Sequence, residues 1–242
     1  MSYIQGFVIP VRATNKAAYR KMAEESAPIF TDHGAQRIVE CWGDDVPNGD
    51  TTDMYRAVAA ENGEHVVFSW IDWESKQACD SAHDKMMTDE RMQNPPNEMP
   101  FDGMRMIYTG FESVGESGKC GNAGYVQGYV APVLQDKRDA LAEICATMRN
   151  VAMDCGALHA VDAVADEIAD GKVTDFKRAV KAKEGEAVAF GFVEWPSKKA
   201  CELGSEKMRD DVRMPGPGTD MPLDGRRLIY GGFEVMLDTE GE

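Results

Sequence analysis

Apolar residues follow two different periods along the chain, and these periods predict an alternation of strands and helices. The segment YIQGFVIPV (3–11) is β-branched and aromatic, which indicates a strand that ends at Pro10. A helix is predicted from Thr14 to Gly34, because a glycine suits the end of a helix and the later counterpart repeats apolar residues at steps of three and four. The apolar residues of that counterpart are Leu141, Ile144, Cys145, Met148, Val151, Ala152 and Cys155.

The next segments predict a strand and then a hairpin. A strand over 35–42 leads into the acidic loop GDDVPNG. Two extended runs, 52–60 and 65–73, follow it and are joined near Asn62-Gly63, a pair that tolerates the positive φ of a tight turn. Pro28 is expected to kink or shorten the preceding helix.

A second helix and a last strand complete the pattern. Ser75 is placed to cap a helix whose small and apolar residues share one face, and 99–112 turns at Asp102-Gly103 into the final strand. The order β-α-β-(β)-β-α-β is an α+β, ferredoxin-like plan with an added hairpin strand. Such a sheet carries helices on one face and needs cover on the other.

The chain repeats itself at an offset of 122 positions. Tyr3–Glu112 and Tyr125–Glu234 share 44 identities over 110 positions without a gap, which indicates a duplicated domain. The glycine-rich segment 115–123 reads as a linker that spans at most about 30 Å. Two modules, 1–114 and 124–242, are therefore expected to lie side by side as an intrachain dimer.

Several segments resemble a known family. YIQGFVIPV, GDDVPNG, TDMYRAV, VVFSW and MPFDGMRMIYTGFE, with its mate MPLDGRRLIYGGFE, resemble the YbaA-like family of uncharacterised bacterial proteins in the dimeric α+β barrel superfamily. The resemblance implies that two modules pair their sheets into a barrel, here within one chain. It implies a fold and no activity. In the second copy, Ala169 departs from the family pattern by replacing the proline seen at Pro47.

Composition limits the partners. The net charge of -16 is shared by both copies, and a surface so rich in carboxylates repels nucleic acid. The chain has no basic and apolar leader and no run long enough to span a membrane, so a cytoplasmic protein is expected. Its six cysteines form no C-x-x-C pair and are expected to be reduced.

The most similar part of the two copies is the last strand with its turn. Asp102 and Asp224 read either as turn residues or as carboxylates at the mouth of a pocket. Arg105 and Arg227 begin the strand, where each is either an anchor for a carboxylate or phosphate or one partner of a structural ion pair, with Asp53 or Glu112 as candidate partners of Arg105. Arg56 and Arg178 carry the same two interpretations.

Aromatic residues and the acidic loop supply the other candidates. Tyr108 and Tyr230 could orient a substrate or be core residues, and Trp73 and Trp195 are expected beneath a helix or in a cavity wall. Asp44, in the acidic loop, suggests acid/base or cation chemistry or a solvated position.

No histidine occupies the same position in both copies, and no motif for a metal, nucleotide or nucleophilic site occurs. No metal or cofactor is therefore expected. Three functions remain to be compared: a small-molecule site inside the barrel, with a cofactor-free oxygenase or isomerase as the enzymatic version; a non-catalytic interaction module; and RNA binding, which the acidic surface and missing aromatic motif oppose. The divergence between the copies favours the first as the functional one.

Overall fold

Eight strands close into one antiparallel barrel in the computed structural model, which describes residues 2–93, 98–165, 167–216 and 218–240. The hydrogen-bonded order around the barrel is β1-β3-β2-β8-β5-β7-β6-β4. The strands are β1 (Tyr3–Arg12), β2 (Arg37–Asp45), β3 (Glu64–Trp73), β4 (Ile107–Gly118), β5 (Tyr125–Leu134), β6 (His159–Ala165), β7 (Glu186–Trp195) and β8 (Ile229–Asp238). The protein is therefore an α+β barrel, as the sequence predicts.

The two halves of the chain build the barrel together. The first half (2–119) contributes β4-β1-β3-β2, and the second half (120–240) contributes β8-β5-β7-β6. The barrel closes where β2 pairs with β8 and where β4 pairs with β6. Each half therefore supplies both edges that the other needs, which removes the exposed strand edges of a four-stranded sheet.

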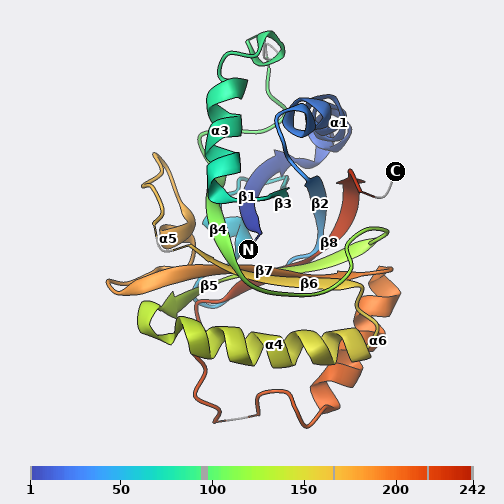
Figure 1. Ribbon diagram of the computed structural model, residues 1–242, viewed down its shortest axis with the longest axis vertical. Helices are drawn as coiled ribbons and strands as arrows, with labels where there is room; N and C mark the ends of the chain where they lie inside the picture. Colours follow the sequence, from blue (N-terminus) through green and yellow to red (C-terminus); the bar gives the residue numbers. More distant parts are fainter. Residues whose placement is uncertain (1, 94–97, 166, 217, 241–242) are drawn as a thin grey trace.

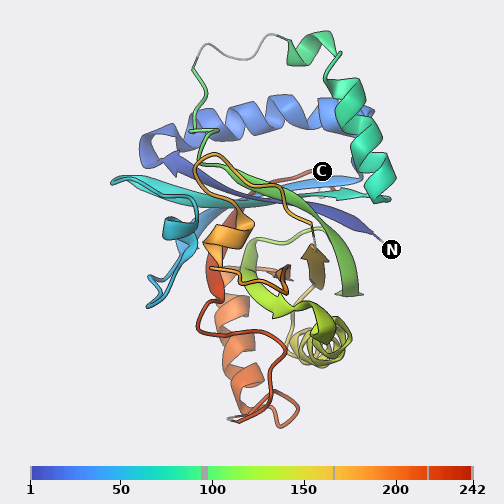
Figure 2. The same ribbon diagram turned by 90° about the vertical axis from the view of Figure 1, so that its left-hand side faces the viewer.

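Long helices cover the outside of the barrel on two opposite sides (Figure 1). The helix α3 packs on β1 and β3 of the first half, and α1 packs on β1, β2 and the adjoining β8. The helix α6 packs on β5 and β7 of the second half, whereas α4 packs on β6 and on the adjoining β4 of the first half. In Figure 2, α1 is seen lengthwise and α4 end-on, so the two long helices cross at a large angle. The helical segments are η1 (Ala13–Asn15), α1 (Lys16–Asp32), α2 (Met54–Ala57), α3 (Lys76–Met86), η2 (Glu90–Met92), η3 (Gln135–Lys137), α4 (Arg138–Asp154), α5 (Phe176–Ala179) and α6 (Lys198–Asp210). None of the described helices is long and apolar enough to cross a membrane.

Aromatic side chains fill the interior of the barrel. The rings of Phe68 and Phe190 stack at 4.6 Å between centroids, and those of Trp70 and Phe192 at 3.9 Å. A glycine of the opposite half makes room for each phenylalanine: a Cβ at Gly6 on β1 would lie 2.8 Å from Phe190 on β7, and a Cβ at Gly128 on β5 would lie 2.8 Å from Phe68 on β3. The interior is thus a packed apolar core and differs from the open binding chamber expected from the sequence.

The prediction of a hairpin strand over 52–60 is wrong, because this segment contains the short helix α2. The side chain of Asp53 accepts a hydrogen bond from the backbone N–H of Arg56 at 2.8 Å, which caps the helix. An aspartate in this position favours a helical turn over the β-propensity of the residues that follow. Asp175 caps α5 in the same way, so both copies carry a helix and neither carries the additional strand.

Other local expectations have mixed outcomes. Gly34 adopts φ +103° at the end of α1, and Gly63 adopts φ +83° in the turn before β3, both as expected. Ser75 caps α3 by accepting from the N–H of Ala78. Pro28 does not shorten α1, because α1 and α4 both have 17 residues. The expected linker begins inside β4, which continues to Gly118.

Candidate functional site

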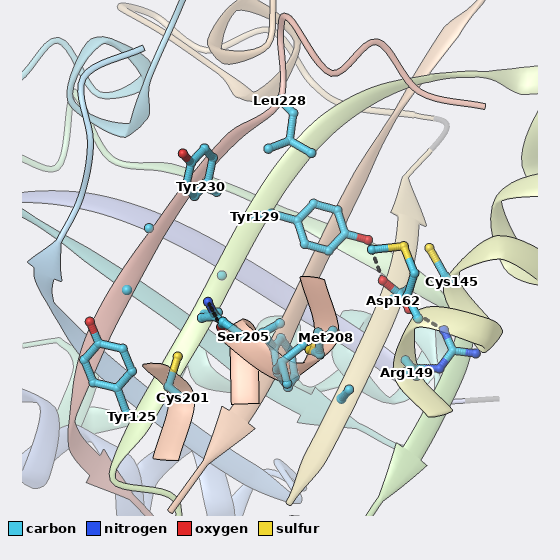
Figure 3. Close-up of a pocket in the computed structure, with 18 of the residues that line it drawn as sticks. Tyr125, Tyr129, Cys145, Arg149, Asp162, Cys201, Ser205, Met208, Leu228 and Tyr230 are labelled. Atoms are coloured by element: carbon cyan, nitrogen blue, oxygen red, sulfur yellow. Dashed lines mark hydrogen bonds and ion pairs between the residues drawn. The ribbon is translucent and has the colours of Figure 1, made fainter. Parts of the chain in front are cut away.

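A cavity of about 680 Å³ lies outside the barrel, between the sheet of the second half and the helices α4 and α6 (Figure 3). Strands β5, β6, β7 and β8 form its floor, and the two helices form its walls. Most of its lining is apolar, with a small number of polar side chains. The apolar lining includes Leu141, Ile144, Met148, Ala160, Val193, Met208, Met221, Leu223 and Leu228.

Strand alternation places aromatic and polar side chains of β5 in the cavity floor. Tyr125, Gln127 and Tyr129 lie at every second position of this strand and line the cavity, while the alternate residues Val126 and Val130 face the barrel core. Tyr230 on β8 joins them and is 56% exposed. The floor is therefore a strip of rings beneath the apolar helix faces.

Three polar residues form a connected group at one end of the cavity. The hydroxyl of Tyr129 donates to Asp162 Oδ1 at 2.5 Å, and the guanidinium of Arg149 donates to the other carboxylate oxygen, Oδ2. Arg149 reaches from α4 and Asp162 from β6, and both side chains are less than one tenth exposed. Burial and the adjacent carboxylate raise the pKa of Tyr129 well above its usual value. The hydroxyl thus stays protonated, and the charged pair lies in a largely apolar wall.

A second polar group lies on the side of β5 nearer to α6. The amide of Gln127 donates to Ser205 Oγ at 3.3 Å and accepts from the indole N–H of Trp195 at 3.1 Å. Trp195, one of the candidates from the sequence, therefore contributes indirectly: its indole N–H orients the amide of Gln127, which lines the cavity.

The acidic loop of the first half covers part of this second-half cavity. Asp45 and Pro47 line it. Asp44 accepts from the ammonium of Lys198 at 2.6 Å and from the hydroxyl of Tyr125 at 3.1 Å. Both hydrogen bonds lower the pKa of Asp44, and the bond from Lys198 has the larger effect. The candidate Asp44 therefore lies at the rim of the cavity as a fixed carboxylate.

Two thiols in the lining, those of Cys145 and Cys201, are held in the protonated form by burial. Burial raises the pKa of Cys145 to about 12 and that of Cys201 to about 11. Both thiols are protonated near neutral pH, whereas the reactive species is the thiolate. Among the described residues, no three histidine, cysteine or carboxylate side chains are grouped so that they could hold a metal ion.

Arg105 and Arg227 form structural ion pairs. Arg105 binds both carboxylate oxygens of Glu64 at 2.7 and 2.8 Å and also binds Asp102 at 2.8 Å. Arg227 repeats the arrangement with Glu186 at 2.6 and 2.7 Å and with Asp224 at 2.9 Å. The suggested partners of Arg105, Asp53 and Glu112, are therefore not its partners. The arginine bonds lower the pKa of Glu64 and Glu186 and tie the last turn to β3 or β7.

The remaining candidates lie away from the large cavity. Arg56 donates to the carbonyl of Gly49 at 2.7 Å, and Arg178 donates to that of Gly171 at 2.9 Å, so each arginine fixes the loop before its short helix. Trp73 is fully buried in the cluster beneath α3. Tyr108 is 56% exposed and stacks on Phe7 at 5.8 Å.

The group formed by Tyr129, Asp162 and Arg149 was not among the residues predicted from the sequence. The alternation in 125–133 contained a usable signal, because it places Tyr129 on the same face as Tyr125. Arg149 follows Cys145 by four residues and so lies on the apolar face of its helix, where an unpaired charge is unfavourable. An arginine on that face therefore indicates a buried acidic partner on a neighbouring strand, which here is Asp162.

The two halves differ at this cavity. Tyr19 in α1 occupies the position of Leu141, and its ring packs against Phe101 in the first half. Ile38 likewise stands where the second half has Ala160. Larger side chains thus fill the corresponding space of the first half, and the larger cavity belongs to the second half, contrary to the preference for the first copy.

Comparisons with known proteins place the chain in a family without an assigned activity. The family model described as "Protein of unknown function (DUF1428)" matches residues 2–103 and again residues 124–225. The uncharacterised protein YbaA of Escherichia coli K12 is 56% identical over 114 residues, which are 47% of this chain and 97% of YbaA. One copy here thus corresponds to nearly a whole YbaA chain.

Solved structures share the fold at low sequence identity. A putative monooxygenase from Lactobacillus acidophilus aligns with a TM-score of 0.54 and 11% identity, over 99% of this chain and 97% of that one. An anthrone oxidase-like protein aligns with a TM-score of 0.53 and 15% identity, over 98% and 92% of the two chains. At such identities the likeness concerns the fold alone.

Proposed function

We propose that this chain, which belongs to the DUF1428 family of proteins of unknown function, binds a small and largely apolar molecule in the cavity between β5–β8, α4 and α6. The observation that carries the proposal is the combination of an apolar cavity with one buried polar group, Tyr129, Asp162 and Arg149, in its wall. Ligand sites commonly combine apolar walls with a small number of fixed polar groups that orient the ligand.

The volume and the polar group define the ligand class. About 680 Å³ lies within the usual range for drug-sized molecules. Tyrosine rings along β5 and β8 offer faces for a planar ring system, and the guanidinium of Arg149 has N–H groups beyond those bound to Asp162 and Ser117. A ring compound that carries an oxygen acceptor at one end fits this arrangement.

A ligand screen with one blocking variant tests the proposal. Leu141→Tyr introduces the residue that fills the equivalent space of the first half, where Tyr19 donates to Glu40 at 2.8 Å. We expect compounds that raise the melting temperature of the wild type to leave that of Leu141→Tyr unchanged. Leu203→Tyr, the same change at an exposed position of α6 outside the lining, is the control and keeps the shifts. Equal shifts in Leu141→Tyr and the wild type would refute the cavity as the site.

A cofactor-free oxygenase or isomerase is the second candidate, and the carboxylate of Asp162 favours it. A base in an apolar cavity can remove a proton from a ligand, because little water competes for that proton. The name of the Lactobacillus protein, a putative monooxygenase, is compatible with this candidate through the fold only. With a ligand from the screen, Asp162→Asn should retain binding and lose turnover. Turnover that survives this change would exclude Asp162 as the base.

We infer that the two copies are ferredoxin-like modules, 1–114 and 124–242, that form an intrachain dimer. The strand orders β4-β1-β3-β2 and β8-β5-β7-β6 support this division, because each is the order of a βαββαβ sheet. The six cysteines are unpaired, which agrees with a cytoplasmic location.

A further inference from the structure

A second and smaller cavity, of about 280 Å³, lies on the outer face of the first half. Much of its lining comes from positions that correspond, at the offset of 122, to positions lining the large cavity. The corresponding pairs include Tyr3 and Tyr125, Gln5 and Gln127, Cys79 and Cys201, Asp80 and Glu202, His83 and Ser205, and Tyr108 and Tyr230. The duplication thus produced two related cavities, and the smaller one has a more polar lining.

The smaller cavity needs the second half to be complete. Residues 169–171, Thr174 and Asp175 of the second half line it. Asp45 and Pro47 of the first half line the large cavity in the same manner. Each half therefore covers the cavity of the other with the loop that follows its second strand.

The geometry around Gln5 fixes the direction of its amide. His83 Nδ1 lies 3.1 Å from the carbonyl oxygen of Cys79, which can only accept, so this ring nitrogen carries the hydrogen. In the neutral ring, Nε2 is then an acceptor, and it lies 3.2 Å from Gln5 Nε2. The amide nitrogen of Gln5 therefore points to His83.

The other end of the same amide has no partner. Gln5 is 4% exposed, lines the cavity, and its Oε1 has no hydrogen-bond donor among the described residues. Buried polar atoms without a partner are rare, and a bound ligand is one explanation for them. The acceptor is therefore available to a molecule in the cavity.

The second half shows how the same amide is satisfied without a ligand. Gln127 Oε1 accepts from the indole N–H of Trp195, and its nitrogen donates to Ser205. In the first half, His83 replaces that serine, and the indole nitrogen of Trp73 also has no hydrogen-bond partner among the residues that the structure describes. The difference between the halves thus leaves an open acceptor in the smaller cavity.

Carboxylates give this cavity a negative character. Asp80 is paired with Lys76 at 2.7 Å, and Asp175 is paired with Arg178 at 3.3 Å, so neither adds net charge. Asp170 lines the cavity and has no cationic partner within the described part of the chain. The lining of the cavity thus includes one carboxylate without a cationic partner and one amide oxygen without a donor among the described residues.

We propose that the first-half cavity is a second binding site, specific for a small organic cation with N–H donors such as a primary ammonium group. The ammonium donates to Gln5 Oε1, and the carboxylate of Asp170 balances its charge. The large cavity, in contrast, offers the rings and the guanidinium of an apolar site, so the two sites differ in ligand class and this proposal does not depend on the first.

Titration calorimetry with 1,4-diaminobutane, and with 1,4-butanediol as its neutral analogue, tests the proposal at 150 mM salt. We expect one equivalent of the diamine to bind the wild type and the diol not to bind. Gln5→Leu should weaken diamine binding at least tenfold, and Asp170→Asn about threefold or more. Gln36→Leu, at an exposed glutamine outside the cavity, should bind as the wild type does.

His83→Ser is a second variant that tests the role of Gln5 in diamine binding, and it can be used if Gln5→Leu does not fold. It restores the serine of the second half, where the corresponding amide accepts from Trp195, and we expect Gln5 to accept from Trp73 in the same way, which removes the open acceptor. Diamine binding should fall at least tenfold while the melting temperature is retained. The proposal would be overturned if the wild type did not bind the diamine, bound it weakly at several sites, or bound the diol equally well. It would also be overturned if Gln5→Leu or His83→Ser bound the diamine with wild-type affinity.

Discussion

Arg37 on β2 and His159 on β6 stand at the same position of the two halves, and both bind the carboxylate of Glu194. Arg37 also binds Asp238 at 2.7 Å, and His159 lies 2.8 Å from Glu116. Burial lowers the pKa of His159, but the hydrogen bonds to Glu194 and Glu116 outweigh it and raise the pKa. Since these residues come from both halves, the cluster joins them inside one end of the barrel.

Removing Arg37 should therefore destabilise the whole barrel. Arg37→Met leaves the fully buried Glu194 without its main counter-charge, and we expect a loss of about 3–5 kcal/mol in the free energy of unfolding in urea. Arg20→Met, which removes an exposed pair with Glu24, should cost less than about 1 kcal/mol. Equal losses in the two variants would show that the cluster does not hold the halves together.

The two halves should assemble when they are made as separate chains. Fragments 1–119 and 120–242 each lack two of the strand pairings that close the barrel, β2 with β8 and β4 with β6. Mixed fragments are expected to form a one-to-one complex in size-exclusion chromatography with light scattering, and the complex should recover the ligand shifts of the intact chain. Two fragments that stay monomeric and folded when mixed would contradict the intrachain dimer.

The stability of the protein should depend on pH through Glu40. Burial raises the pKa of Glu40 from 4.5 to about 7 in the folded state, partly offset by hydrogen bonds from Tyr19 and Ser69. A raised pKa means that the folded state binds the proton more tightly, so stability is present below about pH 4.5 and is lost as the pH rises towards 7. In Glu40→Gln, the fall in stability between pH 5 and 8 should be smaller than in the wild type.

Two comparisons make the pH measurement specific. Glu25→Gln, at a side chain that is 69% exposed, should keep the wild-type pH profile. Some dependence should remain in Glu40→Gln, because burial also raises the pKa of Asp72 to about 7. A profile in Glu40→Gln identical to that of the wild type would show that Glu40 is not the group that titrates.

The helix α6 packs so closely on Trp195 that a methyl group added at Gly204 should destabilise the protein. A Cβ at Gly204 would lie 2.3 Å from the indole ring of Trp195, although the first half has Ala82 at this position. Gly204→Ala should therefore destabilise the protein by about 1–3 kcal/mol in urea unfolding. Gly216→Ala, where nothing lies within 4 Å of the added atom, is the control and should change stability little. If Gly204→Ala had the same free energy of unfolding as the wild type, the indole ring of Trp195 would have to move aside without cost.

The sequence predicts those features that depend on local patterns or on the repeat. Ser75 as a cap and Gly63 in a turn follow from local backbone preferences, and the barrel follows from two copies that each need cover. The short helix α2 was missed because one side-chain cap, that of Asp53, outweighs the β-propensity of its neighbours. Such competition depends on a single hydrogen bond and leaves little trace in a hydrophobic pattern.

The candidate site was harder to predict because it depends on packing between helices and sheet. Tyr230 and Asp44 were identified, but the alternation pattern does not reveal that Leu141 leaves space where Tyr19 fills it. Arg105 and Arg227 stood out because both copies retain them, yet their partners Glu64 and Glu186 lie 41 residues away in sequence. Similarity between the copies marked the residues that hold the fold, while the size of the large cavity depends on positions at which the copies differ, such as Leu141 and Tyr19.

The most direct test of the large cavity is a crystal structure of the protein with a ligand from the thermal screen. We expect electron density for the ligand between α4, α6 and β5, with a polar atom of the ligand within hydrogen-bond distance of Tyr129, Asp162 or Arg149. Density for the ligand within the barrel core or on another surface, with this cavity holding only solvent, would show that the large cavity is not the binding site.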